Sequence, residues 1–203
     1  MYSYSIGFKL LSFEEFPKIL DQTNADDIRS SAFNGFIFKI NDNQISYRLS
    51  GNFYSKRMSF SNGCTECEIL GGRLNDNHIK LGFEKNFSYG LFQPYFGFDL
   101  GVKRSVFKGV SSGLIADDSR MPYDIKSEKN GFTVSPLLGI KVTASHLTIA
   151  AEASADVFYN RERQEKSYHA TPGTSNVQKS NNWEYLLKPL GMLTIQYNFG
   201  EIY

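Results

Sequence analysis

The chain has 203 residues, a formal net charge of +1 and 21% charged residues, so nothing in it indicates a nucleic-acid partner or an acidic substrate. It contains no run of 18 or more apolar residues, which excludes a transmembrane helix. Aromatic residues make up 15% of the chain, and the 17 Phe and 12 Tyr favour strands over helices. A single domain spanning residues 1–203 is expected at this length.

Strict alternation of apolar and polar residues predicts strands with two different faces, and eight segments of the chain alternate in this way. In chain order they are Tyr2 to Leu11, about Ala32 to Ile40, Ile45 to Lys56, His78 to Phe87, Leu91 to about Phe107, about Gly131 to Val142, Leu147 to Tyr159 and about Trp183 to Phe199. In the fifth segment, "LFQPYFGFDLG", every second residue is apolar from Phe92 to Leu100. An even number of such strands allows a sheet of hairpins to close into a ring.

The links between these segments alternate between short and long. Three are tight turns rich in turn-forming residues, namely Asn41-Asp42-Asn43, Ser88-Tyr89-Gly90 and Ala144-Ser145. Four are long and polar, namely Ser12 to Ser31, Ser59 to Asn77, Lys108 to Asn130 and Asn160 to Asn182. Short turns at one end and long loops at the other are typical of outer-membrane barrels. The sequence therefore predicts an all-β fold: an eight-stranded antiparallel up-and-down transmembrane β-barrel with short periplasmic turns and long external loops.

Two short motifs carry a resemblance to a known family. "LFQPYFGFDLG" and the closing "LKPLGMLTIQYNFG" resemble strands of the small outer-membrane β-barrel proteins of the Bacteroidota, which are related in architecture to the OmpA transmembrane domain and to OmpX. The resemblance implies an eight-stranded barrel exported to the outer membrane, and it supplies no functional residues. The opening "MYSYSIGFKL" lacks the features of a signal peptide, so we expect that the export signal has been removed.

Alternation alone leaves two interpretations of the apolar face, which either meets lipid or lines the lumen of a soluble, lipocalin-like barrel. The polar face carries charges of both signs, and a narrow lumen tolerates such charges only when they are paired. We therefore predict a lumen charge network made of Arg48, Lys80, Glu84, Asp99, Lys103, Lys141, Glu152 and Asp156. The predicted lipid-facing positions are Phe92, Phe96, Phe98, Leu100, Leu138, Ile140, Leu193 and Ile195.

Three prolines stand out because a closed sheet has no edge strand to accommodate them. Pro94, Pro136 and Pro189 each remove a backbone donor from a predicted ladder. One interpretation is that they lie at bulges or near the membrane interface. The other is that they mark a weak seam through which lipid enters the barrel laterally.

The sequence offers few candidates for chemistry. Cys64 and Cys67 form a "CTEC" motif in the second long link. A structural zinc site needs a second pair of ligands at matched spacing, which the chain lacks, so we predict a local disulfide there. The histidines His78, His146 and His169 are interpreted as single polar residues on the surface. We predict no catalytic residue, no metal site and no cofactor.

These features favour a non-enzymatic outer-membrane protein whose long external loops bind a surface ligand or stabilise the cell envelope. The expected partners are membrane lipid and lipopolysaccharide, with other outer-membrane proteins as a further option and no nucleic acid. Three alternatives stay open: an accessory subunit of a larger outer-membrane complex, a lipid-modifying barrel enzyme, and a soluble lipocalin-like binder.

Overall fold

The computed structural model describes residues 2–18, 29–42, 44–61, 68–88, 90–113, 123–168 and 175–201. Its eight strands are β1 (Tyr2–Glu14), β2 (Arg29–Asp42), β3 (Ile45–Ser61), β4 (Glu68–Asn86), β5 (Phe92–Gly113), β6 (Tyr123–Ala144), β7 (Leu147–Tyr168) and β8 (Ser175–Glu201). Among these residues there is no helix of the length and hydropathy needed to cross a membrane.

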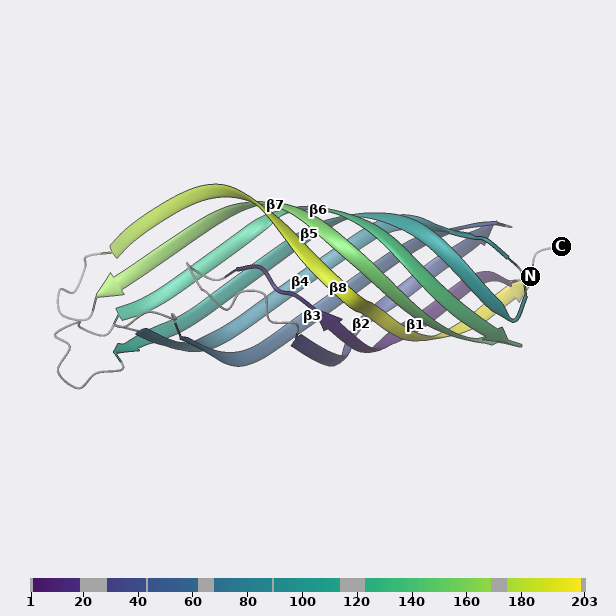
Figure 1. Ribbon diagram of the computed structural model, residues 1–203, viewed down its shortest axis with the longest axis horizontal. Helices are drawn as coiled ribbons and strands as arrows, with labels where there is room; N and C mark the ends of the chain where they lie inside the picture. Colours follow the sequence, from purple (N-terminus) through teal and green to yellow (C-terminus); the bar gives the residue numbers. More distant parts are fainter. Residues whose placement is uncertain are drawn as a thin grey trace.

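Each strand pairs antiparallel with the next one in the chain, and β8 pairs with β1 (Figure 1). The strands therefore form a closed ring with up-and-down connections, which confirms the predicted fold class. The short links after β2, β4 and β6 lie at the same end as the start of β1 and the end of β8. We call this the short-turn end, and the opposite end the long-loop end.

The register of the ladders fixes the tilt of the strands. Paired residues can be followed from Phe92 in β5 through β6, β7, β8, β1, β2, β3 and β4, and they lead back to β5 at Val102, ten residues further along. With about 3.3 Å per residue and about 4.8 Å between strands, this displacement corresponds to a tilt of about 40°.

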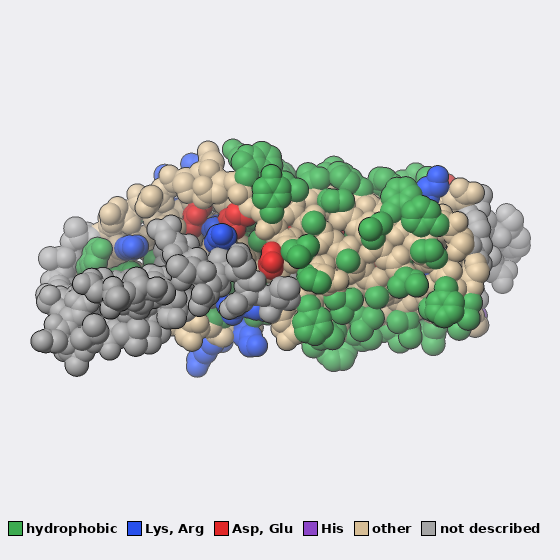
Figure 2. All heavy atoms as spheres, in the orientation of Figure 1, with side chains coloured by type: hydrophobic (Ala, Val, Ile, Leu, Met, Phe, Trp, Pro, Cys, Tyr) green, Lys and Arg blue, Asp and Glu red, His purple; other side chains and the backbone are tan. Residues whose placement is uncertain are grey.

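The outer face of the barrel is apolar from the short-turn end up to a sharp boundary. The last apolar row crosses five strands through Ile79, Val102, Phe132, Tyr159 and Trp183. The next outward row is polar and consists of Asn77, Arg104, Asn130, Arg161 and Asn181. We call the apolar surface below this boundary the apolar band, and Figure 2 shows hydrophobic side chains gathered over this half of the molecule.

The height of the apolar band follows from the strand geometry. On β5 it extends from Phe92 to Val102, which is about 33 Å along the strand and about 25 Å along the barrel axis at this tilt. An outward apolar band about 25 Å tall is characteristic of transmembrane barrels.

Beyond the apolar band the strands continue, but here apolar side chains point into the barrel and charged side chains point outward. Leu74, Phe107 and Ile125 are buried inside the barrel there, whereas neighbours such as Arg73 and Lys108 are exposed on the outside. The inward side chains belong to a buried apolar cluster made of Phe16, Tyr54, Met58, Leu70, Leu74, Phe107, Tyr123 and Ile125.

The predicted strand ends are therefore wrong at the long-loop end. β4 begins at Glu68 rather than at His78, β6 begins at Tyr123, and β8 begins at Ser175. Much of three predicted long links is strand, because the alternation reverses its phase at the edge of the apolar band and no longer continues the pattern below it.

β2 and β3 separate above the apolar band. Their ladder ends at the pair Gly35 and Asn52, and beyond it β3 pairs only with β4 among the described residues. β2 is irregular at this point, since Phe33 has a φ of 51°, in the left-handed region that favours glycine. Phe16, which follows β1, packs against Tyr54 of β3 with ring centroids 4.4 Å apart.

Each of the three prolines lies at an interruption of a ladder. Pro189 belongs to a bulge, since β8 advances four residues there while β7 advances two. Pro136 lies where the β6–β7 ladder skips two residues of each strand. Pro94 lies one residue beyond the last β4–β5 pair, and its carbonyl accepts a hydrogen bond from the N–H of Phe87 at 2.9 Å. These positions favour the bulge interpretation over a lateral seam.

Candidate functional site

Charged side chains fill the lumen inside the apolar band. All eight residues of the predicted lumen network point inward, and none is more than 8% exposed: Arg48, Lys80, Glu84, Asp99, Lys103, Lys141, Glu152 and Asp156. They come from the five consecutive strands β3 to β7, which is why a single strand pattern cannot show their pairing.

Glu84 is fully buried and forms ion pairs with cations from three other strands. Its carboxylate lies 2.7 Å from Nζ of Lys39, 2.8 Å from Nζ of Lys141 and 3.3 Å from Nη1 of Arg48. A buried carboxylate is stable only when such partners replace its lost water.

Arg48 connects Glu84 to two further carboxylates. Its guanidinium donates two parallel hydrogen bonds to Glu152, at 2.7 and 2.8 Å, and its Nε lies 3.2 Å from Asp99. The hydroxyl of Tyr95 donates to the same Glu152 at 2.8 Å. Bidentate pairs of this kind are among the strongest hydrogen bonds in proteins. Three cations and three carboxylates thus balance in a lower charge cluster of Lys39, Arg48, Glu84, Asp99, Lys141 and Glu152.

Asp156 is the centre of an upper charge cluster, made of His78, Lys80, Asp156 and Lys188. Its carboxylate lies 2.7 Å from Nζ of Lys80, 2.9 Å from Nζ of Lys188 and 3.7 Å from Nδ1 of His78. The other ring nitrogen of His78 lies 2.7 Å from the hydroxyl of Thr133. The interpretation of His78 as a surface residue is therefore wrong, because the polar face of β4 turns it into the lumen.

Aromatic rings follow the charge pairs toward the long-loop end. Lys103 pairs with Asp76 at 2.9 Å, and its ammonium lies 5.7 Å from the ring centroid of Phe16 and 6.0 Å from that of Phe158. Cations over aromatic faces are attracted by the ring quadrupole. Lys103 therefore joins the charged part of the lumen to the buried apolar cluster above it.

The predicted network omits three residues that complete these clusters. Lys39 and His78 alternate in phase with the inward side chains of their strands, so the sequence contains a signal for both. Lys188 has the same parity as the inward residues Thr194 and Gln196 of its strand, so the sequence contains a signal for it as well. Its pairing with Asp156 depends on the bulge beside Pro189, which the alternation does not indicate.

The eight residues predicted to face lipid all lie on the outer face within the apolar band. Leu138, Phe92, Leu100 and Ile140 are 48–65% exposed, Phe98 and Ile195 are each 37% exposed, and Phe96 and Leu193 are half-buried. The predicted disulfide of Cys64 and Cys67 lies outside the described residues, as does His169. His146 is exposed in the turn before β7.

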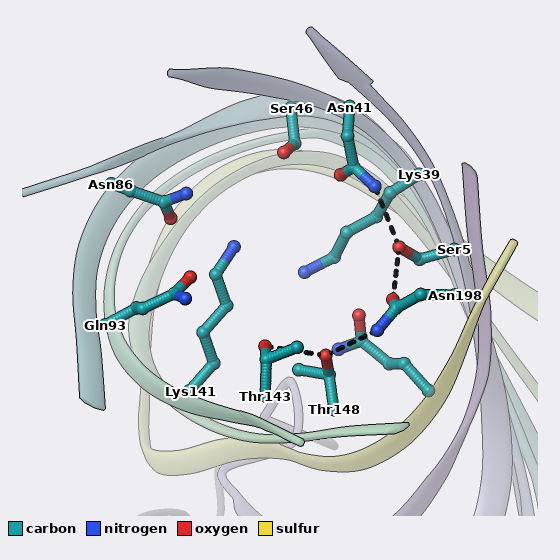
Figure 3. A pocket seen from close by; sticks show the side chains of 11 residues that line it. Ser5, Lys39, Asn41, Ser46, Asn86, Gln93, Lys141, Thr143, Thr148 and Asn198 are labelled. Carbon is teal, nitrogen blue, oxygen red and sulfur yellow. Dashed lines mark hydrogen bonds between the residues drawn. The ribbon is translucent and has the colours of Figure 1, made fainter. Parts of the chain in front are cut away.

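A polar cavity of about 300 Å³ lies at the short-turn end of the lumen (Figure 3). The ammonium groups of Lys39 and Lys141 point into it, and both pair with Glu84 of the lower charge cluster. Its wall carries a hydrogen-bond chain from Asn41 to Ser5, from Ser5 to Asn198 and from Asn198 to Thr148. This cavity can hold water or small polar solutes. Among the described residues, no three side chains of the metal-ligating types His, Cys, Asp and Glu gather at one point.

Tyr95 keeps its place beside the lower charge cluster because Gly139 lies opposite it. A Cβ at Gly139 would lie 2.3 Å from Cζ and 2.5 Å from Oη of Tyr95. We expect Gly139→Val to displace the ring, to break its hydrogen bond to Glu152 and to lower the free energy of unfolding by about 1–3 kcal/mol. Urea unfolding in detergent measures this loss. The matched control is Gly71→Val, since open space surrounds the Cβ position of Gly71; equal losses in both variants would contradict the prediction.

No family model matches the chain, and no curated protein matches it. Among solved structures it is similar to the ferric yersiniabactin uptake receptor FyuA from Yersinia pestis, with a TM-score of 0.37 and 12% sequence identity. The match covers 74% of this chain and 23% of the receptor. The chain therefore spans less than a quarter of that receptor, and a similarity of this size leaves its function open.

Proposed function

We propose that this protein is a non-enzymatic β-barrel of the outer membrane whose external end binds a surface ligand or stabilises the cell envelope. The observation that supports this best is the apolar band outside a closed ring whose lumen is filled by paired charges. Hydrocarbon offers backbone groups no hydrogen-bond partners, and a closed ring pairs them internally. In this arrangement the short-turn end faces the periplasm and the long-loop end faces outward.

A soluble lipocalin-like barrel would distribute its side chains the other way round. Such barrels keep an apolar lumen for the ligand and a polar exterior. Here the lower charge cluster occupies the lumen at the level where Phe98 and Leu100 are exposed outside. Exposing so many large apolar side chains to water would produce a patch far above the few hundred Å² tolerated on soluble monomers.

The first test concerns insertion. We expect the purified chain to fold only with detergent or lipid vesicles, to float with those vesicles, and to migrate faster on a denaturing gel before boiling than after it. The physical reason is that the apolar band needs hydrocarbon and that a closed barrel resists unfolding. A folded, monodisperse protein in buffer without detergent would contradict the proposal and favour the lipocalin-like alternative.

The second test concerns conductance. Glu84, Arg48 and Glu152 bridge the lumen from β4, β3 and β7, and Asp156 does so again above them. We expect planar-bilayer recordings to show little or no steady current, because ions would have to break these buried pairs to pass. Insertion is verified first by the mobility shift on gels. Large, stable open-channel currents would show that the charge clusters leave a pore.

A further inference from the structure

Four cations form a continuous row on the outside of the barrel, between the apolar band and the long-loop end. Arg57 of β3 pairs directly with Arg73 of β4, Arg73 with Lys108 of β5, and Lys108 with Lys126 of β6. Residues that are direct cross-strand partners share a face, and like charges in such positions repel each other. The fold therefore maintains a repulsive arrangement, which a bound anion would relieve.

Among the described residues, only one of the four cations has an anionic partner. Lys126 lies 3.5 Å from Glu128. Hydrogen bonds from Asn130 and Arg104 hold the pKa of Glu128 below its usual range, so this carboxylate is charged. Within the part of the chain that the structure describes, no carboxylate lies within ion-pair distance of the other three cations, and all three are exposed.

These three cations surround a groove of about 700 Å³ on the outer face. Arg57, Arg73 and Lys108 line it together with Ser59 and Val110. A side chain at Gly71 would project into open space, so the absence of one leaves the floor of the groove free. The groove thus offers room for a ligand and three positive groups from three adjacent strands. We call it the cationic groove.

The height of the cationic groove indicates which ligand can reach it. Lys108 follows Val102, where the apolar band ends on β5, by six residues, which places it about 15 Å above the apolar band at the tilt derived above. Headgroups of simple phospholipids occupy only about 5–8 Å beyond the hydrocarbon of each leaflet. The acidic groups of a larger saccharide headgroup extend further and reach the level of these cations.

We propose that the cationic groove binds the phosphate groups on the saccharide headgroup of an outer-leaflet glycolipid, that is, of lipopolysaccharide. The inference rests on the proposed outer-membrane location, and it names a surface ligand for the external end. Arg57 and Arg73 are suited to the task because the guanidinium fork matches phosphate and carboxylate oxygens in bidentate geometry. The adjacent Lys108 supplies a point charge.

The test compares two triple variants of the full chain folded in neutral detergent. The groove variant combines Arg57→Gln, Arg73→Gln and Lys108→Gln, which removes the three cations of the groove. The control variant combines Lys85→Gln, Arg161→Gln and Lys179→Gln, which removes the same charge from exposed positions elsewhere on the outer face. The probe is a rough lipopolysaccharide with phosphorylated core sugars, and its binding to each protein is measured by titration at a fixed salt concentration. We expect binding about 100-fold weaker in the groove variant, because each cation near an anionic surface contributes roughly fivefold, and within threefold of the parent protein in the control variant.

Three further probes separate the sources of the acidic group. Chemically dephosphorylated lipopolysaccharide, phosphatidylglycerol vesicles and inorganic phosphate should each bind weakly and equally to both variants. Equal losses in the two variants, or tight binding of any of these three probes at the groove, would overturn the inference. Vesicle insertion of every protein is measured first. If the parent protein inserts into vesicles but does not bind lipopolysaccharide, only the proposed ligand of the cationic groove is refuted. If the parent protein does not insert, the proposed function is refuted.

Discussion

Replacing Phe98 with arginine is expected to lower the free energy of unfolding in lipid vesicles by about 2–4 kcal/mol, the cost of an arginine at the bilayer midplane on a lipid-facing strand position. Phe98 lies near the middle of the apolar band on β5 and is 37% exposed on its outer face. The loss is a large share of a typical stability of about 5–15 kcal/mol. A denaturant titration of vesicle-inserted protein measures it.

The matched control for this variant lies on the same strand and the same face. Val110 is an exposed apolar residue of β5 beyond the apolar band. We expect Val110→Arg to change the free energy by less than about 1 kcal/mol, since the penalty for arginine falls to about 0–1 kcal/mol near the interface. If Phe98→Arg and Val110→Arg are equally harmless, the apolar band does not meet lipid.

Replacing Arg48 with methionine is expected to cost about 3–5 kcal/mol, because removing one partner of a buried ion pair strands the others. The substitution leaves Glu84, Asp99 and Glu152 without their shared cation at the centre of the lower charge cluster. Urea unfolding in detergent gives the loss. Arg161→Met, on the exposed outer face, is the matched control and should stay within about 0.5 kcal/mol of the parent protein.

A second substitution separates stranded charge from lost packing. Glu152→Gln in the Arg48→Met background removes one of the stranded carboxylates, so we expect the double variant to regain part of the lost stability. Coupling energies between contacting residues are commonly about 0.5–3 kcal/mol. A double variant less stable than Arg48→Met would show that the charge network contributes little and that packing dominates.

The alternation of residues predicts the fold only where lipid and lumen impose opposite demands. Within the apolar band Ile79, Leu81 and Phe83 of β4 are outside, and the pattern is clear. Toward the long-loop end of the same strand Leu74 and Leu70 are inside, so the apolar residues have moved from odd to even positions. A single phase of alternation along β4 therefore predicts a loop before His78, where the structure has strand. The reversal marks the level at which the outer face of the barrel changes from apolar to polar and the inner face from polar to apolar.

The pairing inside the lumen is less accessible to sequence than the strands. The pattern indicates that Glu84 and Arg48 point inward, but their contact depends on the register around the whole ring. Lys188 joins Asp156 across a bulge that shifts β8 by two residues relative to β7. Single-residue patterns contain no information about such shifts, because a bulge is set by the neighbours on both sides of the strand.

The separation of β2 from β3 above the apolar band has a consequence for the order in which the barrel opens. Amide hydrogens exchange fastest where the fewest ladder bonds must break. β2 shares eight paired positions with β3, whereas β3 and β4 share seventeen. The upper part of the β1–β2 hairpin is thus the segment of lowest local stability among the described strands, and the tilted packing of Phe16 against Tyr54 limits its opening. The rest of the ring stays closed while that hairpin frays, so exposure of its amides to solvent does not require the barrel to open.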